Sequence, residues 1–186
     1  MSTNRYTVET RESGVIILGA PNSLKDSLVE ELLLNQAHAV YVKNINDLES
    51  LQGGFDPDQI IYFDDDQTSE WLKKSNDGLI DQINRLVGDG LSLLISVCHE
   101  DRGENSAPFT TTPKLITYSD YVGASELYSK TISGWISSII NAHIITVPGD
   151  GLGEYGLISQ NDLVRLLALA ILQSSRSAKT IALGNP

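Results

Sequence analysis

Short, unbroken apolar runs alternate with helix-like stripes of leucine and isoleucine along this chain, and this alternation limits the possible folds more than any other feature. Residues 14–20 read GVIILGA, the pattern of a strand buried on both faces of a sheet. Strands alternating with helices predict an α/β fold in which helices cover both faces of a doubly wound parallel sheet. Strands are also expected at residues 38–44, 58–64, 91–97, 143–149 and 179–185, with a short apolar stretch at 114–118, and helices at 23–35, 79–87, 126–140 and 159–171.

Two helix starts carry the pattern of a capping box. Ser23 is followed three residues later by Asp26, and Ser159 is followed in the same way by Asp162. In this motif the serine side chain accepts a hydrogen bond from the first turn of the helix. The sequence therefore predicts Ser23 and Ser159 as N-caps, and it predicts that the first helix ends near Asn35.

Length and charge limit the class of protein. The chain has 186 residues and a net charge of −11, so we expect one domain over residues 13–186 after a flexible lead-in at 1–12. Such an acidic balance argues against a nucleic-acid or membrane surface, since both need clustered Lys and Arg. A single cysteine, Cys98, is typical of a reducing compartment, and no apolar run approaches the roughly 20 residues that span a bilayer. We expect a cytoplasmic protein.

The order of these segments resembles a known family. Residues 15–44 match a strand, glycine turn, helix and second strand; residues 55–66 match a third strand, and residues 90–103 match the strand that leads into an active-site segment. Together they resemble the extended short-chain dehydrogenase/reductases, the family of nucleotide-sugar epimerases and dehydratases. The resemblance implies a Rossmann-like fold, and it implies that the substrate lobe is largely missing. It continues at residues 126–135, 145–171 and 179–186.

The resemblance places the cofactor-binding turn at Gly19, Asn22 and Lys25, where the family has Gly-x-x-Gly-x-x-Gly. Asn22 can adopt the left-handed conformation that keeps such a turn. Lys25 is expected to be a solvated side chain in a remodelled turn, and the alternative is that it contacts a phosphate. Lys43 stands at the end of the second strand, where a basic residue hints at NADP.

Three consecutive carboxylates, Asp64, Asp65 and Asp66, follow the third predicted strand. Near a bound pyrophosphate each pair of like charges would cost about 1 kcal/mol or more, even in a watery site. We expect these residues to form a solvated loop, and the alternative is a Mg²⁺ site. In either case the run disfavours a dinucleotide.

The family's catalytic residues are largely replaced. Its Ser and Tyr positions correspond to Cys98 and Glu126, and only Lys130 matches. Tyr128 cannot substitute, because residues two apart on a helix face different directions. Cys98 and His99 are strand neighbours that point to opposite faces, so we expect a buried, inert cysteine. No histidine has the spacing of a zinc ligand.

Apolar residues mark one face of the helix predicted at residues 126–140. We expect them to pack in the core, and the alternative is that they form a protein interface, where tryptophan is enriched. The stripe consists of Ile132, Trp135, Ile136, Ile139 and Ile140.

Three functions remain open from the sequence. The first is a non-catalytic relative that binds no cofactor and serves as a binding, scaffolding or regulatory subunit, with a protein partner or a second copy. The alternative is a small NADP-dependent reductase or epimerase-type enzyme with a non-standard site around Lys25, Lys43 and Lys130. The third is a metal- or phosphate-responsive domain that uses residues 64–66.

Overall fold

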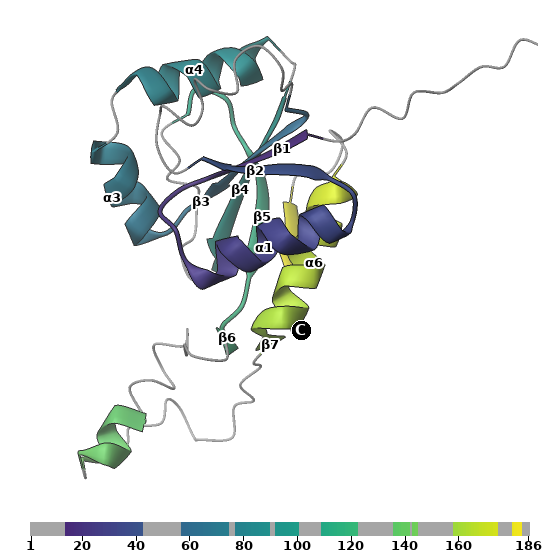
Figure 1. The fold of residues 1–186 in the computed structure, drawn as a ribbon. Coiled ribbons are helices and arrows are strands. Elements are labelled where there is room, and N and C mark those ends of the chain that lie inside the picture. The colour runs from purple at the N-terminus through teal and green to yellow at the C-terminus, as the bar shows by residue number, and fades with distance from the viewer. Residues whose placement is uncertain are drawn as a thin grey trace, which may run out of the picture.

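The fold is an α/β sandwich built on a six-stranded sheet (Figure 1). The computed structural model describes residues 14–42, 57–74, 77–89, 92–100, 109–122, 136–141, 143–144, 158–174 and 180–183. Its strands are β1 (Gly14–Leu18), β2 (His38–Val42), β3 (Gln59–Phe63), β4 (Leu93–His99), β5 (Lys114–Tyr118) and β8 (Thr180–Leu183). They lie in the order β2-β1-β3-β4-β5-β8, and every neighbouring pair is parallel. The parallel sheet predicted from the sequence is confirmed.

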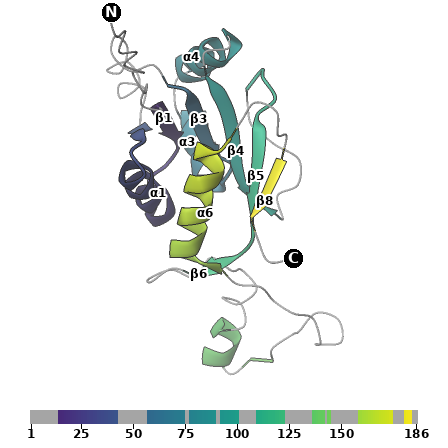
Figure 2. The same ribbon diagram turned by 90° about the vertical axis from the view of Figure 1, so that its right-hand side faces the viewer.

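Helices cover both faces of this sheet (Figure 2). Alternate residues of β1 divide between two apolar clusters: Val15 and Ile17 face one side, whereas Ile16 and Leu18 face the other. Because both faces are buried, the strand has to be apolar throughout, which explains the unbroken run in the sequence. The helices α1 (Ser23–Leu34) and α6 (Gln160–Leu172) pack on the first side, and α3 (Asp66–Lys74) and α4 (Asp77–Gly88) lie on the second.

The helix ends agree with the sequence except at one cap. Ser159 caps α6 as predicted, since its Oγ accepts from the backbone N–H of Asp162 at 3.1 Å. Helix α1 ends at Leu34 with Asn35 as its C-cap, in agreement with the predicted end near Asn35. Its N-cap is Asn22 rather than Ser23, because the Asn22 side chain reaches the backbone N–H of Lys25 at 2.9 Å.

Helix α3 and a short second sheet were not expected. The sequence of α3, DQTSEWLKK, contains only Trp71 and Leu72 as apolar residues, too few to form a recognisable stripe. Leu72 is nevertheless buried against the α4 side chains Leu79 and Ile83. The second sheet joins β6 (Tyr121–Val122) to β7 (Ile158–Ser159), just before α6.

The apolar stripe in the segment at residues 136–144 is exposed. Residues 136–140 are helical, and Ile136, Ile139 and Ile140 expose 44%, 62% and 77% of their surface. The expectation that this stripe packs in the core is therefore wrong for these three residues, and Figure 1 shows their helix apart from the sheet. Residues 143–144 are not in a strand, contrary to the prediction. Several predicted features lie outside the described residues: the lead-in at 1–12, Lys43, Glu126, Lys130, Ile132 and Trp135.

Candidate functional site

The strand order reverses between β1 and β3, which makes the carboxyl ends of these two strands the natural ligand site of the fold. The chain leaves β1 toward β2 on one side and returns to β3 on the other. In open α/β sheets, ligands bind in the crevice outside the strand ends at this switch point. Here the turn after β1 meets the residues after β3, and Lys25 joins them.

The Lys25 side chain occupies this crevice and is completely buried. Its Nζ donates to the Ala20 carbonyl at 2.8 Å and to Thr68 Oγ1 at 2.9 Å, and it lies 2.9 Å from Asp65 Oδ2. The three N–H groups of the ammonium thus each have a partner. It also lies 5.3 Å from the centre of the Phe63 ring, within the range of a cation–π contact.

The prediction of a solvated Lys25 is wrong, and helix geometry gives the reason. Residues 25, 28 and 32 are separated by three and four positions, so they share the buried face of α1 with Leu24. Burial lowers the pKa of the Lys25 ammonium, while the nearby Asp65 carboxylate acts in the opposite direction. A buried lysine of this kind needs internal partners, and the crevice supplies them.

Gly19 explains how closely these groups approach the turn. Its φ of +133° is a conformation that favours glycine, and a Cβ there would lie 2.5 Å from Thr68 Oγ1 and 3.2 Å from Lys25 Nζ. In dinucleotide-binding turns a glycine lets the pyrophosphate approach the backbone. In this chain it is the side chains of Thr68 and Lys25 that approach the backbone at Gly19.

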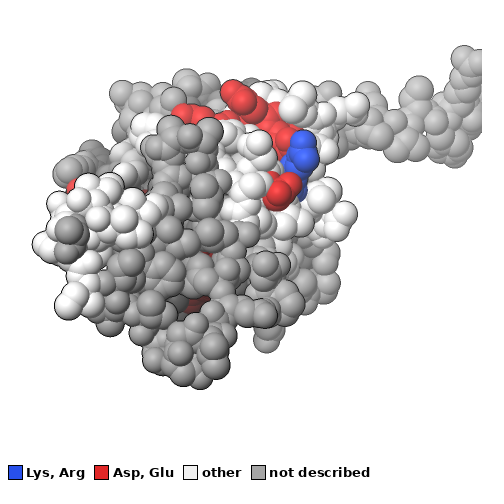
Figure 3. Space-filling view, turned by 90° about the horizontal axis from the view of Figure 1, so that it is seen from below, with Lys and Arg blue, Asp and Glu red and all other residues white. Residues whose placement is uncertain are grey.

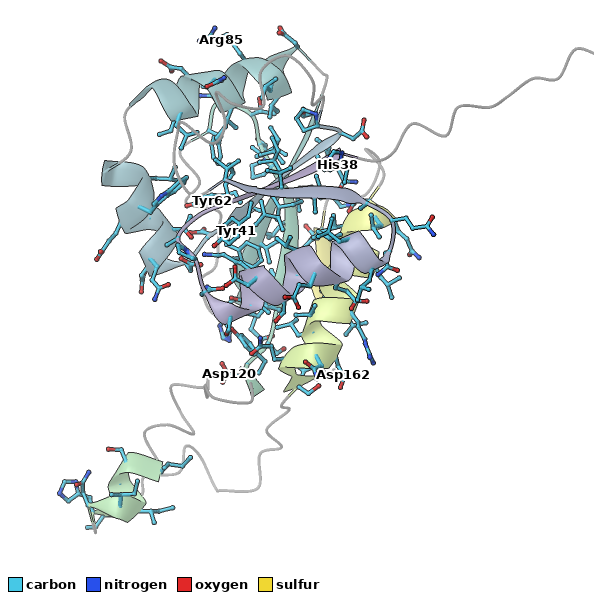
Figure 4. The ribbon with its side chains drawn as sticks, viewed as in Figure 1. His38, Tyr41, Tyr62, Arg85, Asp120 and Asp162 are labelled. Carbon is cyan, nitrogen blue, oxygen red and sulfur yellow. The ribbon has the colours of Figure 1, made fainter. Side chains whose placement is uncertain are left out.

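Asn22 and Tyr41 complete the closure of the turn. Asn22 has an extended φ of −155°, so the predicted left-handed conformation is wrong. Its side chain accepts the Lys25 backbone N–H, a donor at the helix start of the kind that phosphates use. The Tyr41 hydroxyl donates to the Ala20 carbonyl at 2.7 Å, in the region between α1 and α3 (Figure 4). Burial raises the pKa of the Tyr41 hydroxyl above its ordinary value.

The three aspartates after β3 have separate environments rather than one solvated loop. Asp64 is only 3% exposed, and its backbone N–H donates to the Val97 carbonyl of β4. Asp65 caps α3, because its Oδ1 accepts the Thr68 backbone N–H at 2.6 Å. Asp66 is exposed but begins α3. The expected solvated loop is therefore wrong, and within the described part of the chain no group of three His, Cys, Asp or Glu residues could hold a metal.

A second polar cluster lies where β4 and β5 end. His99 Nε2 and Asp120 Oδ1 are 2.8 Å apart, and Ser119 Oγ donates to Glu100 Oε2 at 2.9 Å. Figure 4 shows Asp120 beside β6 at the end of the sheet. The two bonds link β4 to the residues after β5. Cys98 is buried, as predicted, and its neighbour His99 contacts Asp120.

The described surface is strongly acidic. Of its Lys and Arg side chains, Lys25 and Lys114 are buried, and Arg85 and Arg165 are exposed. Figure 3 shows acidic side chains gathered on one side of the face seen from below, with basic side chains beside them.

No described helix has both the length and the apolar character needed to cross a membrane.

Comparisons with known proteins identify the fold. No protein-family model matches the chain, and no curated protein matches its sequence. Among solved structures, GDP-L-fucose synthetase from Naegleria fowleri bound to NADP is 12% identical, with a TM-score of 0.52 over 95% of this chain and 78% of the other. UDP-N-acetylglucosamine 4-epimerase from Bacillus cereus is 10% identical, with a TM-score of 0.54 over 94% and 76%. This chain shares their fold.

A third neighbour extends this result to another enzyme class. The dTDP-glucose 4,6-dehydratase from Bacillus anthracis in complex with NAD is 11% identical, with a TM-score of 0.51 over 92% of this chain and 75% of the other. All three enzymes are extended short-chain dehydrogenase/reductases, so the resemblance seen in the sequence is confirmed for the Rossmann-like fold. About a quarter of each neighbour's chain lies outside the match.

The structure brings together part of the predicted site and adds residues to it. Gly19, Asn22 and Lys25 meet at one turn, together with Asp65. Thr68 was missed, although its position three residues after Asp65 is a helix-cap spacing that could have revealed it. No comparable signal marks Tyr41 or the His99–Asp120 pair, because their partners come from distant segments.

Proposed function

We propose that this chain is a non-catalytic relative of the extended short-chain dehydrogenase/reductases that uses their sheet as a scaffold for binding a protein. The observation that carries the proposal is the buried Lys25, held with Thr68 against the Cα of Gly19. A dinucleotide pyrophosphate would have to displace an ammonium with three internal partners. The replacements of the family's Ser and Tyr by Cys98 and Glu126 support the same conclusion.

The surface supports a protein ligand. The exposed isoleucines Ile136, Ile139 and Ile140 lie on one helix, at positions i, i+3 and i+4, and expose apolar area of the kind that protein contacts bury. Residues 131–149 contain no Lys, Arg, Asp or Glu, in a chain whose net charge is −11. The acidic surface elsewhere favours a basic partner, because charge complementarity accelerates association.

A titration with NADPH and NADH, followed by calorimetry, tests the absence of a cofactor. We expect no binding tighter than about 100 μM, which corresponds to roughly 5.5 kcal/mol. Tighter binding would contradict the proposal and favour the alternative, a small NADP-dependent reductase, which the NADP and NAD bound to two fold neighbours also support. In that case Lys25→Ala should change the affinity, whereas Arg85→Ala, on the exposed side of α4, should leave it unchanged.

A charge placed on the exposed isoleucine stripe tests the binding surface. The size of the assembly is measured by sedimentation for the purified chain at several concentrations and in extracts of the cells that produce it. Ile139→Glu should reduce that size, because it places a carboxylate in an apolar contact. Ser137→Glu adds the same charge at another exposed position of the helix and serves as the control. An unchanged assembly with Ile139→Glu would remove this stripe from the interface.

A further inference from the structure

The Asp65 carboxylate is held in the way that a protein holds a small oxyanion. One oxygen, Oδ2, lies 2.9 Å from Lys25 Nζ, and the other, Oδ1, accepts the backbone N–H of Thr68 at 2.6 Å. A cation and a helix start therefore bind the two oxygens of one planar anion. These are the two kinds of group that proteins combine to bind phosphate.

Each of the two donors is also held by parts of the fold other than the carboxylate. The Lys25 ammonium is held by the Ala20 carbonyl and by Thr68 Oγ1, and the Thr68 N–H belongs to the first turn of α3, a helix of nine residues. The positive end of the α3 dipole adds to the charge of the lysine. Removing the carboxylate would thus leave an anion-binding arrangement in place, with a buried positive charge that lacks its counter-ion.

The exposure of the pair gives this arrangement a route to solvent. The Lys25 side chain is 0% exposed, whereas the Asp65 side chain is 28% exposed. Solvent therefore reaches the carboxylate but not the ammonium. An anion from solution could reach Lys25 through the space that the Asp65 side chain now fills.

We propose that Asp65 is a built-in anion that occupies an oxyanion site formed by Lys25, Thr68 and the start of α3. The site would accept inorganic phosphate, or the terminal phosphate of an ester, once the carboxylate is removed, and the carboxylate keeps such ligands out of the native crevice. This inference rests on the proposed function, in which the native crevice takes no dinucleotide. It explains why an acidic side chain stands at the switch point of a fold whose relatives bind phosphate-bearing cofactors there.

Asp65→Ser tests the site, because serine removes the anion, and its short hydroxyl can hold the Thr68 N–H until a phosphate takes its place. The midpoint of thermal unfolding, Tm, is measured in phosphate and in chloride at equal ionic strength. At a phosphate concentration of ten times Kd, binding shifts the folding equilibrium about elevenfold, so we expect the Tm of Asp65→Ser to rise by about 3–6 °C in a protein of this size. The wild-type chain should show no such rise.

Two controls separate binding at this site from a general effect of phosphate. Asp66→Ser removes the same charge from the next residue, which is exposed, and it should behave like the wild type. Lys25→Met combined with Asp65→Ser removes the cation and should abolish the response. A folded Asp65→Ser with the same phosphate response as Asp66→Ser would overturn the proposal.

If Asp65→Ser is unfolded in chloride, folding itself becomes the measurement. The proposal then predicts that phosphate restores the folded state, measured by circular dichroism. A failure of phosphate to restore it would also overturn the proposal. These outcomes are distinct from a failure of the proposed function. Tight NADPH binding by the wild type would refute that function, whereas the inference about Asp65 depends on how the variant responds to phosphate.

Discussion

At the carboxyl ends of β1 and β3 the central polar side chain is completely buried. At the carboxyl ends of β4 and β5 the polar side chains remain partly exposed to water. Lys25 is 0% exposed and has three internal partners. His99 Nε2 and Asp120 Oδ1 lie 2.8 Å apart, and the two side chains are 23% and 14% exposed. Both ends join neighbouring strands through polar side chains, but only the first fills the crevice where this fold binds ligands.

The comparison shows that polar side chains at one edge of a sheet can fill a crevice in one place and only join neighbouring strands in another. A buried ion pair is costly to break, because the remaining partner loses its counter-ion inside the protein. A partly exposed pair can exchange its partner for water and contributes little. The following variants measure this contrast, from the largest expected effect to the smallest.

Gly19→Ala should cause the largest loss of stability. The added Cβ would lie 2.5 Å from Thr68 Oγ1, and the φ of +133° is strained for alanine. We expect the free energy of unfolding, measured with urea, to fall by about 3–4 kcal/mol from backbone strain and overpacking together. Gly88→Ala is the control: its Cβ would meet nothing within 4 Å, so stability should be unchanged or slightly higher.

Adding Thr68→Ala to Gly19→Ala separates the clash from the strain. The smaller side chain removes the closest contact but also a partner of Lys25, so Thr68→Ala should cost less stability in Gly19→Ala than in the wild type. An equal cost in the two backgrounds would show that Thr68 does not fill the space next to the turn.

Lys25→Met should lower the free energy of unfolding by about 2–3 kcal/mol. Methionine keeps much of the apolar stem but leaves the Thr68 hydroxyl and the Asp65 carboxylate without the ammonium. Arg85→Met, at an exposed position of α4, is the control and should change stability by less than about 0.5 kcal/mol. A loss of the same size in both variants would contradict the burial of Lys25.

The His99–Asp120 pair should contribute less. A double-mutant cycle with His99→Ala and Asp120→Ala isolates the interaction between the two side chains. Because both are partly exposed, we expect a coupling of at most about 1 kcal/mol at neutral pH. A larger value would remove the contrast with the Lys25 crevice.

The smallest effect is a pH dependence that Lys25 adds to the stability. Burial lowers the pKa of Lys25 in the folded chain, so between that value and the ordinary pKa of lysine the unfolded chain binds more protons. Stability then rises with pH in this window. The wild type should therefore gain stability relative to Lys25→Met as the pH is raised from 7 toward 10, in urea titrations of both proteins. A relative loss over this range would contradict the direction of the shift.

Local patterns were enough to predict most of the fold but not the contents of the crevice. The apolar run of β1 and the leucine stripe of α1 depend on burial alone, which the residue types reveal. Helix α3 has too few apolar residues to show itself, so Asp65 was assigned to a loop rather than to a cap. The charge of Lys25 favours a position in solvent, but its place in the helix puts it on the buried face of α1.

The sequence by itself determined the alternation of strands and helices, and with it a parallel sheet buried on both faces. It did so because hydrophobic periodicity is a local property. Only the tertiary structure decided that Lys25, Asp65 and Thr68 meet next to Gly19, because Lys25 and Thr68 are 43 positions apart in the chain. The charge of a lysine does not determine whether its ammonium contacts water or a carboxylate. The strand order determines this here, because it brings the ends of β1 and β3 together.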